Sequence, residues 1–411
     1  MVVVFGVFGL LAVAVLVAGN WYLWRRLFRD PTRGPGLARR AGAAGIAAGW
    51  VLAVGAVVGE RAGAPFWLQQ VLAWPGFLWL ALSVYLLLGV VAGEVVRPLL
   101  RRLLERRARA TAAVPQPQSV PAGPPQAPEA EPEPAPLPEP SRRLFVSRVV
   151  AGAAAAAAVG TVGYGTYGVL RGPAVKRVTV PLAKLPRAAH GYRIAVVSDI
   201  HLGPVLGRGF AQKVVDTVNA TQPDIVAVVG DLVDGSVQNL GPAAAPLSQL
   251  KAPSYFVTGN HEYFSGAAQW VEEVRRLGLH PLENARTELP WFDLAGVNDI
   301  AGKSEGQGPD FTKALGDRDT ARACVLLAHQ PVQIHDAVKH GVDLQLSGHT
   351  HGGQLWPGNF IAAAANPTVA GLERYGDTQL YVSRGAGAWG PPTRVGAPSD
   401  ITVIELASTR A

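Results

Sequence analysis

The sequence predicts an α/β domain in its second half, preceded by helices that cross a membrane. From Val175 onward, short apolar runs alternate with amphipathic segments, which is typical of strands buried beneath helices. Before that point, four stretches without a charged residue are each long enough to span a bilayer as a helix, at about 20 residues. The two patterns together account for most of the 411 residues.

The four predicted membrane spans differ in character. The first and third are continuously apolar rather than periodic, as expected for helices surrounded by lipid. The second and fourth are rich in Ala and Gly, so a buried core helix stays open as an alternative for them. The spans are Val2–Trp24, Ala41–Gly59, Val71–Gly93 and Val149–Leu170.

Arginine residues are distributed unevenly around these spans. Six lie between Arg25 and Arg40, after the first span, whereas the loop after the second span carries only Arg61. Because basic loops remain in the cytoplasm, the first loop is predicted to be cytoplasmic. The third span returns to a second cluster, Arg97 to Arg109, so the fourth must lead out again. We therefore expect a multi-pass protein of the cytoplasmic (inner) membrane with an extracytoplasmic α/β domain.

The basic character of the chain belongs to its hydrophobic half. Residues 1–180 carry 19 Lys and Arg against 8 Asp and Glu, giving +11, and residues 181–411 carry 18 against 22, giving −4. Arginine at membrane boundaries explains this excess, so we expect no nucleic acid partner. The single cysteine, Cys324, excludes an intrachain disulfide.

A Pro-rich segment, Val114–Pro140, cannot bury enough apolar surface to fold and is predicted to be an extended linker. We expect a membrane unit with three transmembrane helices at 1–110, the linker at 111–141, the fourth span at 142–174 and the α/β domain at 175–411. The sequence Ser141–Arg148 looks like a twin-arginine export motif. Alternatively, its arginines only anchor the fourth helix on the cytoplasmic side, and both interpretations remain open.

Nine strands and three helices are predicted in the α/β domain. The strands are 175–182, 193–199, 224–231, 254–260, 292–299, 323–329, 344–349, 379–385 and 401–406. The helices are 209–220, 267–277 and 332–339.

Metal-binding residue types follow several of these strands. Divalent cations need carboxylate, amide and imidazole ligands that converge from separate strands, so this concentration predicts a metal site. Residues two apart in a strand point the same way, and we expect Asp199 and His201, and likewise His349 and His351, to share a side. Glycines at 230, 259 and 348 permit a close backbone approach. The motifs are SDIH (Asp199, His201), GDLVD (Asp231, Asp234), GNHE (Asn260, His261), AHQP (His329) and GHTH (His349, His351).

In order and spacing, these motifs resemble those of the calcineurin-like metallophosphoesterase superfamily, D-x-H, GD, GNH, H and GHxH, over Tyr192–His351. SDIHLG, GDLVDG, GNHEYF and SGHTHGGQ look like its bacterial membrane-anchored branch. The resemblance implies a four-layer α/β/β/α sandwich and two divalent metal ions, Mn, Fe or Zn, with a water shared between them as the nucleophile. It implies one ion held by Asp199, His201, Asp231 and His351, and a second held by Asp231, Asn260, His329 and His349.

The resemblance also implies roles for two residues that are not ligands. His261 would act on the reacting phosphate as a proton donor or charge stabiliser, and Asp234 would orient it. Gly235 stands where the Ser/Thr protein phosphatase branch has a phosphate-gripping Arg, which disfavours protein phosphatase activity. The aromatic residues Tyr263, Phe264 and Trp356 could line a pocket for an apolar substrate tail or belong to the core.

The resulting hypothesis is a membrane-anchored hydrolase of phosphoester or pyrophosphate bonds, with a lipid-headgroup or cell-envelope substrate. UDP-2,3-diacylglucosamine, a lipid A precursor, is a candidate from the family, although its cytoplasmic synthesis conflicts with the predicted topology. One alternative is a non-catalytic membrane sensor or scaffold with a structural metal site. Another makes the first three spans a transport or assembly module with an accessory hydrolase. The sequence leaves the oligomeric state open.

Overall fold

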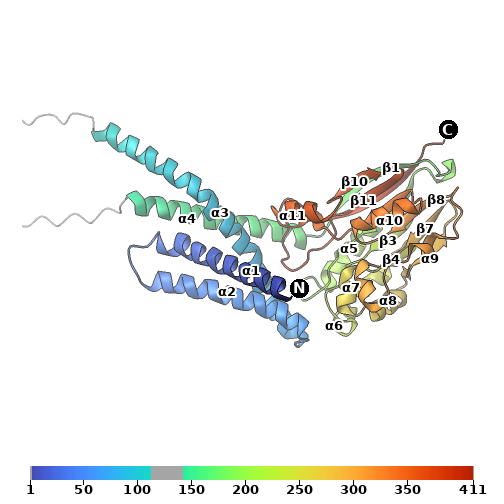
Figure 1. Cartoon of the computed structure of the whole chain (residues 1–411), viewed down its shortest axis with the longest axis horizontal. Helices are drawn as coiled ribbons and strands as arrows, with labels where there is room; N and C mark the ends of the chain where they lie inside the picture. The colour runs from blue at the N-terminus through green and yellow to red at the C-terminus, as the bar shows by residue number, and fades with distance from the viewer. Residues whose placement is uncertain (1, 113–141, 411) are drawn as a thin grey trace, which may run out of the picture. The chain divides into compact units, whose positions relative to one another are not determined.

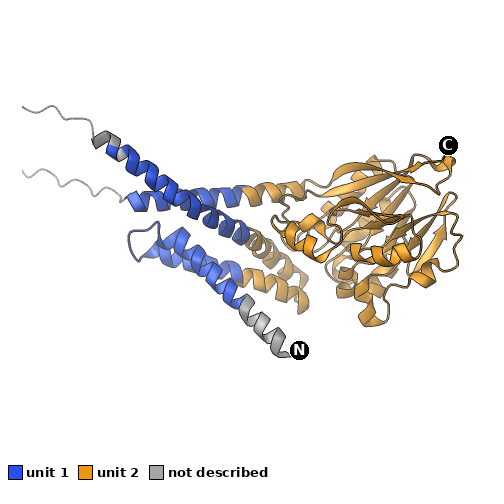
Figure 2. Ribbon diagram, turned by 45° about the horizontal axis from the view of Figure 1, so that its top comes forward, with its two compact units in different colours: residues 1–50, 82–160 blue, residues 51–81, 161–411 orange. Residues whose placement is uncertain are grey.

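The computed structural model describes residues 2–112 and 142–410, which form two compact units (Figure 2). One unit comprises residues 1–50 and 82–160, and the other comprises residues 51–81 and 161–411. The predicted linker at 111–141 lies outside the described residues, except that residues 111 and 112 end a helix. Ser141 of the suggested export motif lies outside them as well.

Four long helices correspond to the four predicted spans: α1 (Val2–Trp24), α2 (Leu37–Arg61), α3 (Phe66–Ala112) and α4 (Arg142–Leu170). Among the described residues, three helices are long and apolar enough to cross a membrane by length and composition, and these are α2, α3 and α4. In the first unit, Arg26 and Arg97 each lie 2.7 Å from the Glu94 carboxylate. Glu94 of α3 therefore pairs with one arginine of its own helix and with one that follows α1.

The α/β part of the second unit contains two six-stranded sheets (Figure 1). Their strand orders are β1-β12-β2-β3-β4-β5 and β10-β11-β9-β8-β7-β6. The strands are β1 (Ala174–Leu182), β2 (Tyr192–Val197), β3 (Ile225–Val229), β4 (Ser254–Val257), β5 (His280–Pro281), β6 (Ala285–Glu288), β7 (Phe292–Gly296), β8 (Ala323–Leu327), β9 (Leu344–Ser347), β10 (Gly371–Tyr375), β11 (Thr378–Val382) and β12 (Asp400–Ser408).

Seven helices accompany the sheets: α5 (Arg208–Ala220), α6 (Val237–Ala244), α7 (Asn260–Ser265), α8 (Ala267–Arg276), α9 (Phe311–Leu315), α10 (Ile334–Lys339) and α11 (Gly358–Ala365). All nine predicted strands and all three predicted helices are present, with ends that differ by a few residues. The sequence prediction missed β5, β6, β10 and four short helices.

Alternate residues of the central strands enter different cores, which makes the domain a four-layer α/β/β/α sandwich as expected. In β2, Ile194 and Val196 belong to the core between the two sheets, whereas Ala195 and Val197 face the core beneath α5, α6 and α8. In the second sheet, Leu326 of β8 faces α9 and α10. Both faces of the central strands are buried, which is why they read as uninterrupted apolar runs.

The turn between α2 and α3 belongs to the same compact unit as the sandwich. Phe66, at the start of α3, packs against the core beneath α5 and α8. Val205, in the loop after the first metal-binding motif, packs against the buried cluster Ala56, Ala73 and Phe77. The membrane hairpin therefore supports the loop that carries Asp199 and His201.

Candidate metal centre

The predicted ligands lie just beyond the ends of strands rather than within them. Strand β2 ends at Val197 and β9 ends at Ser347, and the ligands follow in left-handed backbone conformations. The expectation that side-chain alternation along a strand pairs Asp199 with His201, and His349 with His351, was therefore wrong, because these residues do not lie within strands. Asp and His tolerate this conformation better than most residues. The five ligands with positive φ are Asp199 (53°), His201 (50°), Asp231 (52°), His349 (72°) and His351 (51°).

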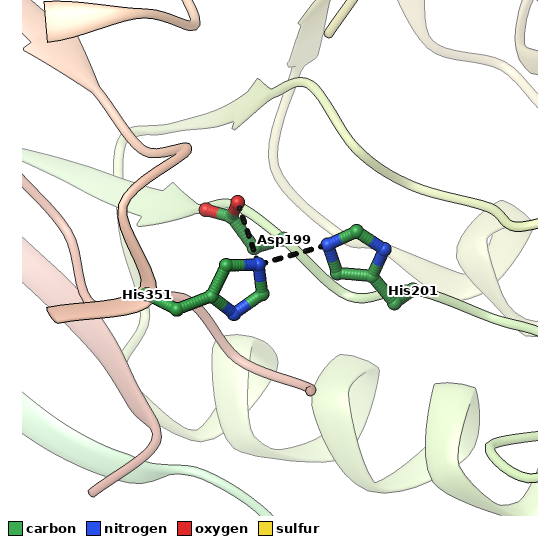
Figure 3. Close-up of side chains that lie close together, drawn as sticks. All are labelled: Asp199, His201 and His351. Carbon is green, nitrogen blue, oxygen red and sulfur yellow. Dashed lines mark hydrogen bonds and ion pairs between the residues drawn. The ribbon is translucent and has the colours of Figure 1, made fainter. Parts of the chain in front are cut away.

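One group of potential ligands consists of Asp199, His201 and His351, all of them buried (Figure 3). The Nε2 atoms of His201 and His351 face one another at 3.0 Å, and the Nε2 of His351 lies 3.4 Å from Oδ1 of Asp199. Two imidazole nitrogens and a carboxylate that converge in a dry site suit a borderline divalent cation. His349 does not join this group, so the two histidines of GHTH serve different positions.

A second group consists of Asp231, His329 and His349. The Nδ1 of His329 donates to the carbonyl of Val229 at 2.9 Å, so its Nε2 is the nitrogen that faces Asp231, 3.2 Å from Oδ2. That buried Nε2 makes no hydrogen bond. A buried nitrogen without a hydrogen-bond partner, aimed at a carboxylate, fits a metal ligand. The Nδ1 of His349 lies 3.0 Å from Oδ1 of Asn260, which brings the predicted amide ligand to the same place.

Asp231 connects the two halves of the site. Its Oδ2 faces both the Nε2 of His201, at 3.7 Å, and the Nε2 of His329, at 3.2 Å. Its Oδ1 accepts a hydrogen bond from the backbone N–H of His261 at 2.9 Å. All seven predicted ligands thus converge on one region from four strand ends and the start of α7.

Asp234 contacts two histidines through one carboxylate. Its Oδ1 lies 2.6 Å from Nδ1 of His261 and 3.0 Å from Nδ1 of His201. The contact with His261 matches the orienting role that the resemblance implied. The contact with His201 was not expected, and it directs the Nε2 of that ring toward the ligand group.

The electrostatics of the site follow from burial and from the histidine charges. Burial alone would raise the pKa of the Asp231 carboxyl, but His329 and His201 bring it well below its usual range. Burial would also raise the pKa of Asp234, but His201 and His261 lower it to about 2. Burial would lower the pKa of His261, yet the hydrogen bond and charge of Asp234 raise it to about 9. His261 is therefore protonated at neutral pH.

Two residues outside the predicted ligand set support the ligands. For the first, Glu262, the sequence favours a turn residue over a partner that supports a ligand, and the structure shows the supporting contacts. Glu262 has no exposed surface, and its carboxylate accepts hydrogen bonds from the backbone N–H groups of Asp231, Leu232 and Gly259 at 2.6 to 3.0 Å. Its place at the third position of α7, after the N-cap Gly259, is that of a capping box and could have revealed this role. Glu262 ties the Asp231 loop to the Asn260 helix.

Arg394 is the second of these residues, and the sequence analysis missed it. Its buried guanidinium donates to the carbonyl of His351 at 2.9 Å and to the Nδ1 of the same ring at 3.0 Å. It also donates to the carbonyls of Gly387 and Ala397. Arg394 lies 43 residues after His351, outside every motif, and no local pattern could have found it.

The glycines of the motifs allow the close approach that the sequence predicted. A Cβ at Gly348 would overlap the side chains of Ser198 and Asp199, and one at Gly259 would overlap the Asp231 carboxylate. At Gly230, where φ is 74°, a Cβ would lie 2.7 Å from Nδ1 of His329. These positions bring the loops together without side chains between them.

Aromatic residues border the site and are not part of the core. The ring of His261 has its centroid 5.5 Å from that of Phe264 and 5.6 Å from that of Trp389, and both aromatic side chains are exposed. Trp356 is also about half exposed. Tyr263 is partly buried, and its hydroxyl lies 3.3 Å from the carbonyl of Gln307. Of the two interpretations left open by the sequence, the core interpretation does not hold for Phe264 and Trp356.

Comparison with known proteins gives a consistent result. The calcineurin-like phosphoesterase family model matches residues 192–353. A transmembrane protein with metallophosphoesterase domain from Danio rerio is 40% identical over 259 residues, which cover 59% of this chain and 59% of that protein. Metallophosphoesterases described as uncharacterized are 38% identical in Helicobacter pylori, covering 59% and 66%, and 35% identical in Aquifex aeolicus, covering 56% and 91%. The chain thus spans well under two thirds of the Danio rerio protein.

Proposed function

The chain belongs to the calcineurin-like metallophosphoesterase family, and from this premise we propose that it is a membrane-anchored, metal-dependent hydrolase of phosphoester or pyrophosphate bonds. One observation carries the proposal. The Asp231 carboxylate faces ligands of both groups, while His261, held by Asp234, lies beside them as a proton donor. A purely structural metal site has no need of such a donor.

The ligand set fits two divalent cations, Mn, Fe or Zn. We assign Asp199, His201, Asp231 and His351 to one ion, and Asp231, Asn260, His329 and His349 to the other. When bound, such ions neutralise phosphate charge and make a coordinated water acidic enough to react at neutral pH. The supporting observation from the chain is chemical: nitrogen and oxygen ligands in a buried site, among them the His329 Nε2 that makes no hydrogen bond.

His261 supplies the proton in this proposal. Asp234 holds its Nδ1 at 2.6 Å, so its Nε2 is the nitrogen left to face the substrate. Because Asp234 raises its pKa to about 9, His261 carries a proton at neutral pH and can donate it to the leaving oxygen. The same positive charge would attract the phosphate group before reaction.

The membrane position favours a lipid or cell-envelope substrate. Three membrane-capable helices and a relative named as a transmembrane protein support membrane association. Glu60, at the end of α2, interacts electrostatically with Asp234 and His261, which supports a position of the α2–α3 turn on the same side of the membrane as the site. That arrangement agrees with the charge rule, which places the turn and the catalytic domain outside the cytoplasm in an inner membrane.

The substrate is proposed only at the level of its chemical class. The absence of an Arg at Gly235 argues against phosphoproteins. UDP-2,3-diacylglucosamine is made in the cytoplasm, on the opposite side from the proposed site, and the names of the relatives give no substrate. A phosphoester of the outer leaflet or of the cell envelope suits the topology better.

The test is hydrolysis by the purified full chain in detergent. After metal removal, the protein is reloaded with Mn²⁺, Fe²⁺ or Zn²⁺ and assayed with p-nitrophenyl phosphate and bis(p-nitrophenyl) phosphate. We expect metal-dependent release of nitrophenol from at least one of them. Metal binding without turnover of either compound, or of headgroup mono- and diesters, would favour the sensor or scaffold alternative.

A further inference from the structure

Helix α11 presents an apolar surface that no other described element covers. None of its residues is buried, and Phe360 and Ile361 are 66% and 76% exposed. The stretch Leu355–Leu372, which includes the helix, contains no charged residue, although the surrounding domain is acidic overall. An uncharged helix with large exposed apolar side chains is typical of a segment that lies in a membrane interface.

Hydrogen bonds link the residues before α11 to a segment that reaches the candidate metal centre. The backbone N–H of Trp356 donates to the carbonyl of Val395 at 2.9 Å, and the Gln354 side chain donates to the carbonyl of Trp389 at 2.8 Å. Trp389 is 57% exposed and lies against the ring of His261, which Phe264 borders on another side. Exposed apolar side chains therefore occur both on α11 and beside the proposed proton donor, in segments that hydrogen bonds hold together.

The residues just before Val395, Thr393 and Arg394, contact the last turns of α4, a membrane-capable helix. The hydroxyl groups of Thr166 and Thr393 are 2.7 Å apart, and a Cβ at Gly165 would lie 2.6 Å from the carbonyl of Arg394. Tyr164 and Tyr167 of α4 are largely exposed at this level. Tyr is enriched where a spanning helix leaves the hydrocarbon.

We propose that α11, Trp356, Trp389 and Phe264 form a lipid-facing surface that lies on the leaflet where α4 ends, and that amphiphilic phosphoesters reach His261 along it. The occupant is lipid because the surface is continuous with the end of a membrane-capable helix and carries no charge along α11. The second part of the proposal rests on the proposed hydrolase function, whereas the first part does not.

The first experiment measures membrane contact and needs no activity. The full chain carries one cysteine, Cys324, which is buried, so Ile361→Cys can be labelled selectively with an environment-sensitive fluorophore. Val338→Cys, at a partly exposed apolar position of α10, is the matched control. Both are reconstituted in vesicles of phosphatidylethanolamine and phosphatidylglycerol that contain brominated lipid.

We expect the bromine atoms to quench the label at position 361 several-fold more than the label at position 338. Equal quenching at the two positions would overturn the lipid-facing surface. Cross-linking of two chains through position 361, without quenching by lipid, would overturn it in favour of a contact between copies.

The second experiment tests the route of the substrate. The quantity measured is a ratio of two turnover rates. The first is for fluorescent phosphatidic acid and phosphatidylglycerol in vesicles, and the second is for the soluble nitrophenyl compounds. The double change F360S and I361S should lower this ratio about tenfold, because two apolar side chains no longer enter the lipid. Val338→Ser should leave it unchanged. An unchanged ratio in the double variant would overturn the route, whereas wild-type protein inactive on all compounds would count against the hydrolase function itself.

Discussion

The Asp234 carboxylate lies 3.0 Å from the Nδ1 of His201, a predicted metal ligand. It therefore fixes the ring so that Nε2 points toward Asp199, Asp231 and His351. Because the same carboxylate also holds His261, one residue orients a ligand and the proposed proton donor together. Asp234 should matter for metal binding as well as for turnover.

Asp234→Asn should lower both metal affinity and turnover. The amide cannot hold two Nδ1–H groups as strongly as a carboxylate, and loss of such a partner typically costs 10- to 100-fold in affinity, on the order of 1 to 3 kcal/mol. Titration of the metal-free protein with Mn²⁺ measures the affinity. Asp216→Asn, on the exposed face of α5, is the control. Wild-type affinity in D234N would show that the contact with His201 has no role in binding.

His261→Ala should reduce turnover while leaving metal content unchanged. Removal of a positioned proton donor typically lowers the rate by about 10²- to 10⁴-fold. Metal analysis and kinetics at saturating metal separate the two effects. His335→Ala removes an exposed histidine of α10 and should change neither. If H261A turned over substrate at the wild-type rate, the proton-donor role would be wrong.

Removal of metal should destabilise the sandwich as well as inactivate it. Asp199, Asp231 and His329 are almost completely buried. The folded domain therefore brings together buried ligand charges that a bound ion would compensate. Ligand at a hundredfold excess over its Kd stabilises a folded protein by about 2.7 kcal/mol. Thermal unfolding with EDTA, and again after Mn²⁺ or Zn²⁺ is restored, measures the difference. An identical melting temperature in the two conditions would contradict a site that binds metal in the folded state.

Gly259→Ala should impair metal binding through a steric effect. The added methyl group would overlap the Asp231 carboxylate, and crowding of this kind typically costs about 1 to 3 kcal/mol. Gly209→Ala is a matched control in α5, where a Cβ meets nothing within 4 Å. That control should stabilise the helix by about 0.5 to 1 kcal/mol. Urea unfolding and Mn²⁺ titration of both variants provide the comparison.

Cys324 should report the unfolding of the second sheet. Burial raises the pKa of its thiol to about 12, so the folded protein keeps the thiol protonated at pH 8 and should react with maleimide only after opening. An unfolded cysteine titrates near pH 8.5, at roughly its unperturbed value. Between about pH 8.5 and 12 the unfolded chain has lost a proton that the folded chain retains, so the free energy of unfolding should fall as pH rises. Rapid labelling of folded protein at pH 8 would contradict the buried position.

The fold could be predicted where both faces of a strand are buried, because the whole strand is then apolar. β3 and β8 show this pattern and were found. β10 was missed because most of its residues are exposed, and α11 was missed because it has no buried face to impose a helical period. These two elements lie at the edge of a sheet and at the proposed membrane surface, where burial gives no sequence signal.

The residues that converge in the structure were named from the sequence, but their backbone conformation was not. Strand periodicity suggested that His349 and His351 share a side, yet left-handed turns send them to different ligand groups. Glu262 had a local signal in its capping-box position, which was underestimated. Arg394 reaches His351 only because β12 and the segment before it return beside β2, so its role depends on tertiary structure.

The left-handed backbone at Asp199, His201, Asp231, His349 and His351 affects how inactive variants should be chosen. Alanine at any of them would remove a ligand and also the polar side chain that helps a residue to tolerate a left-handed conformation, whose cost is about 1 to 2 kcal/mol. An alanine scan would therefore mix misfolding with lost chemistry. Asparagine accommodates this geometry, and substituting it one position at a time would yield catalytically silent proteins whose architecture is preserved.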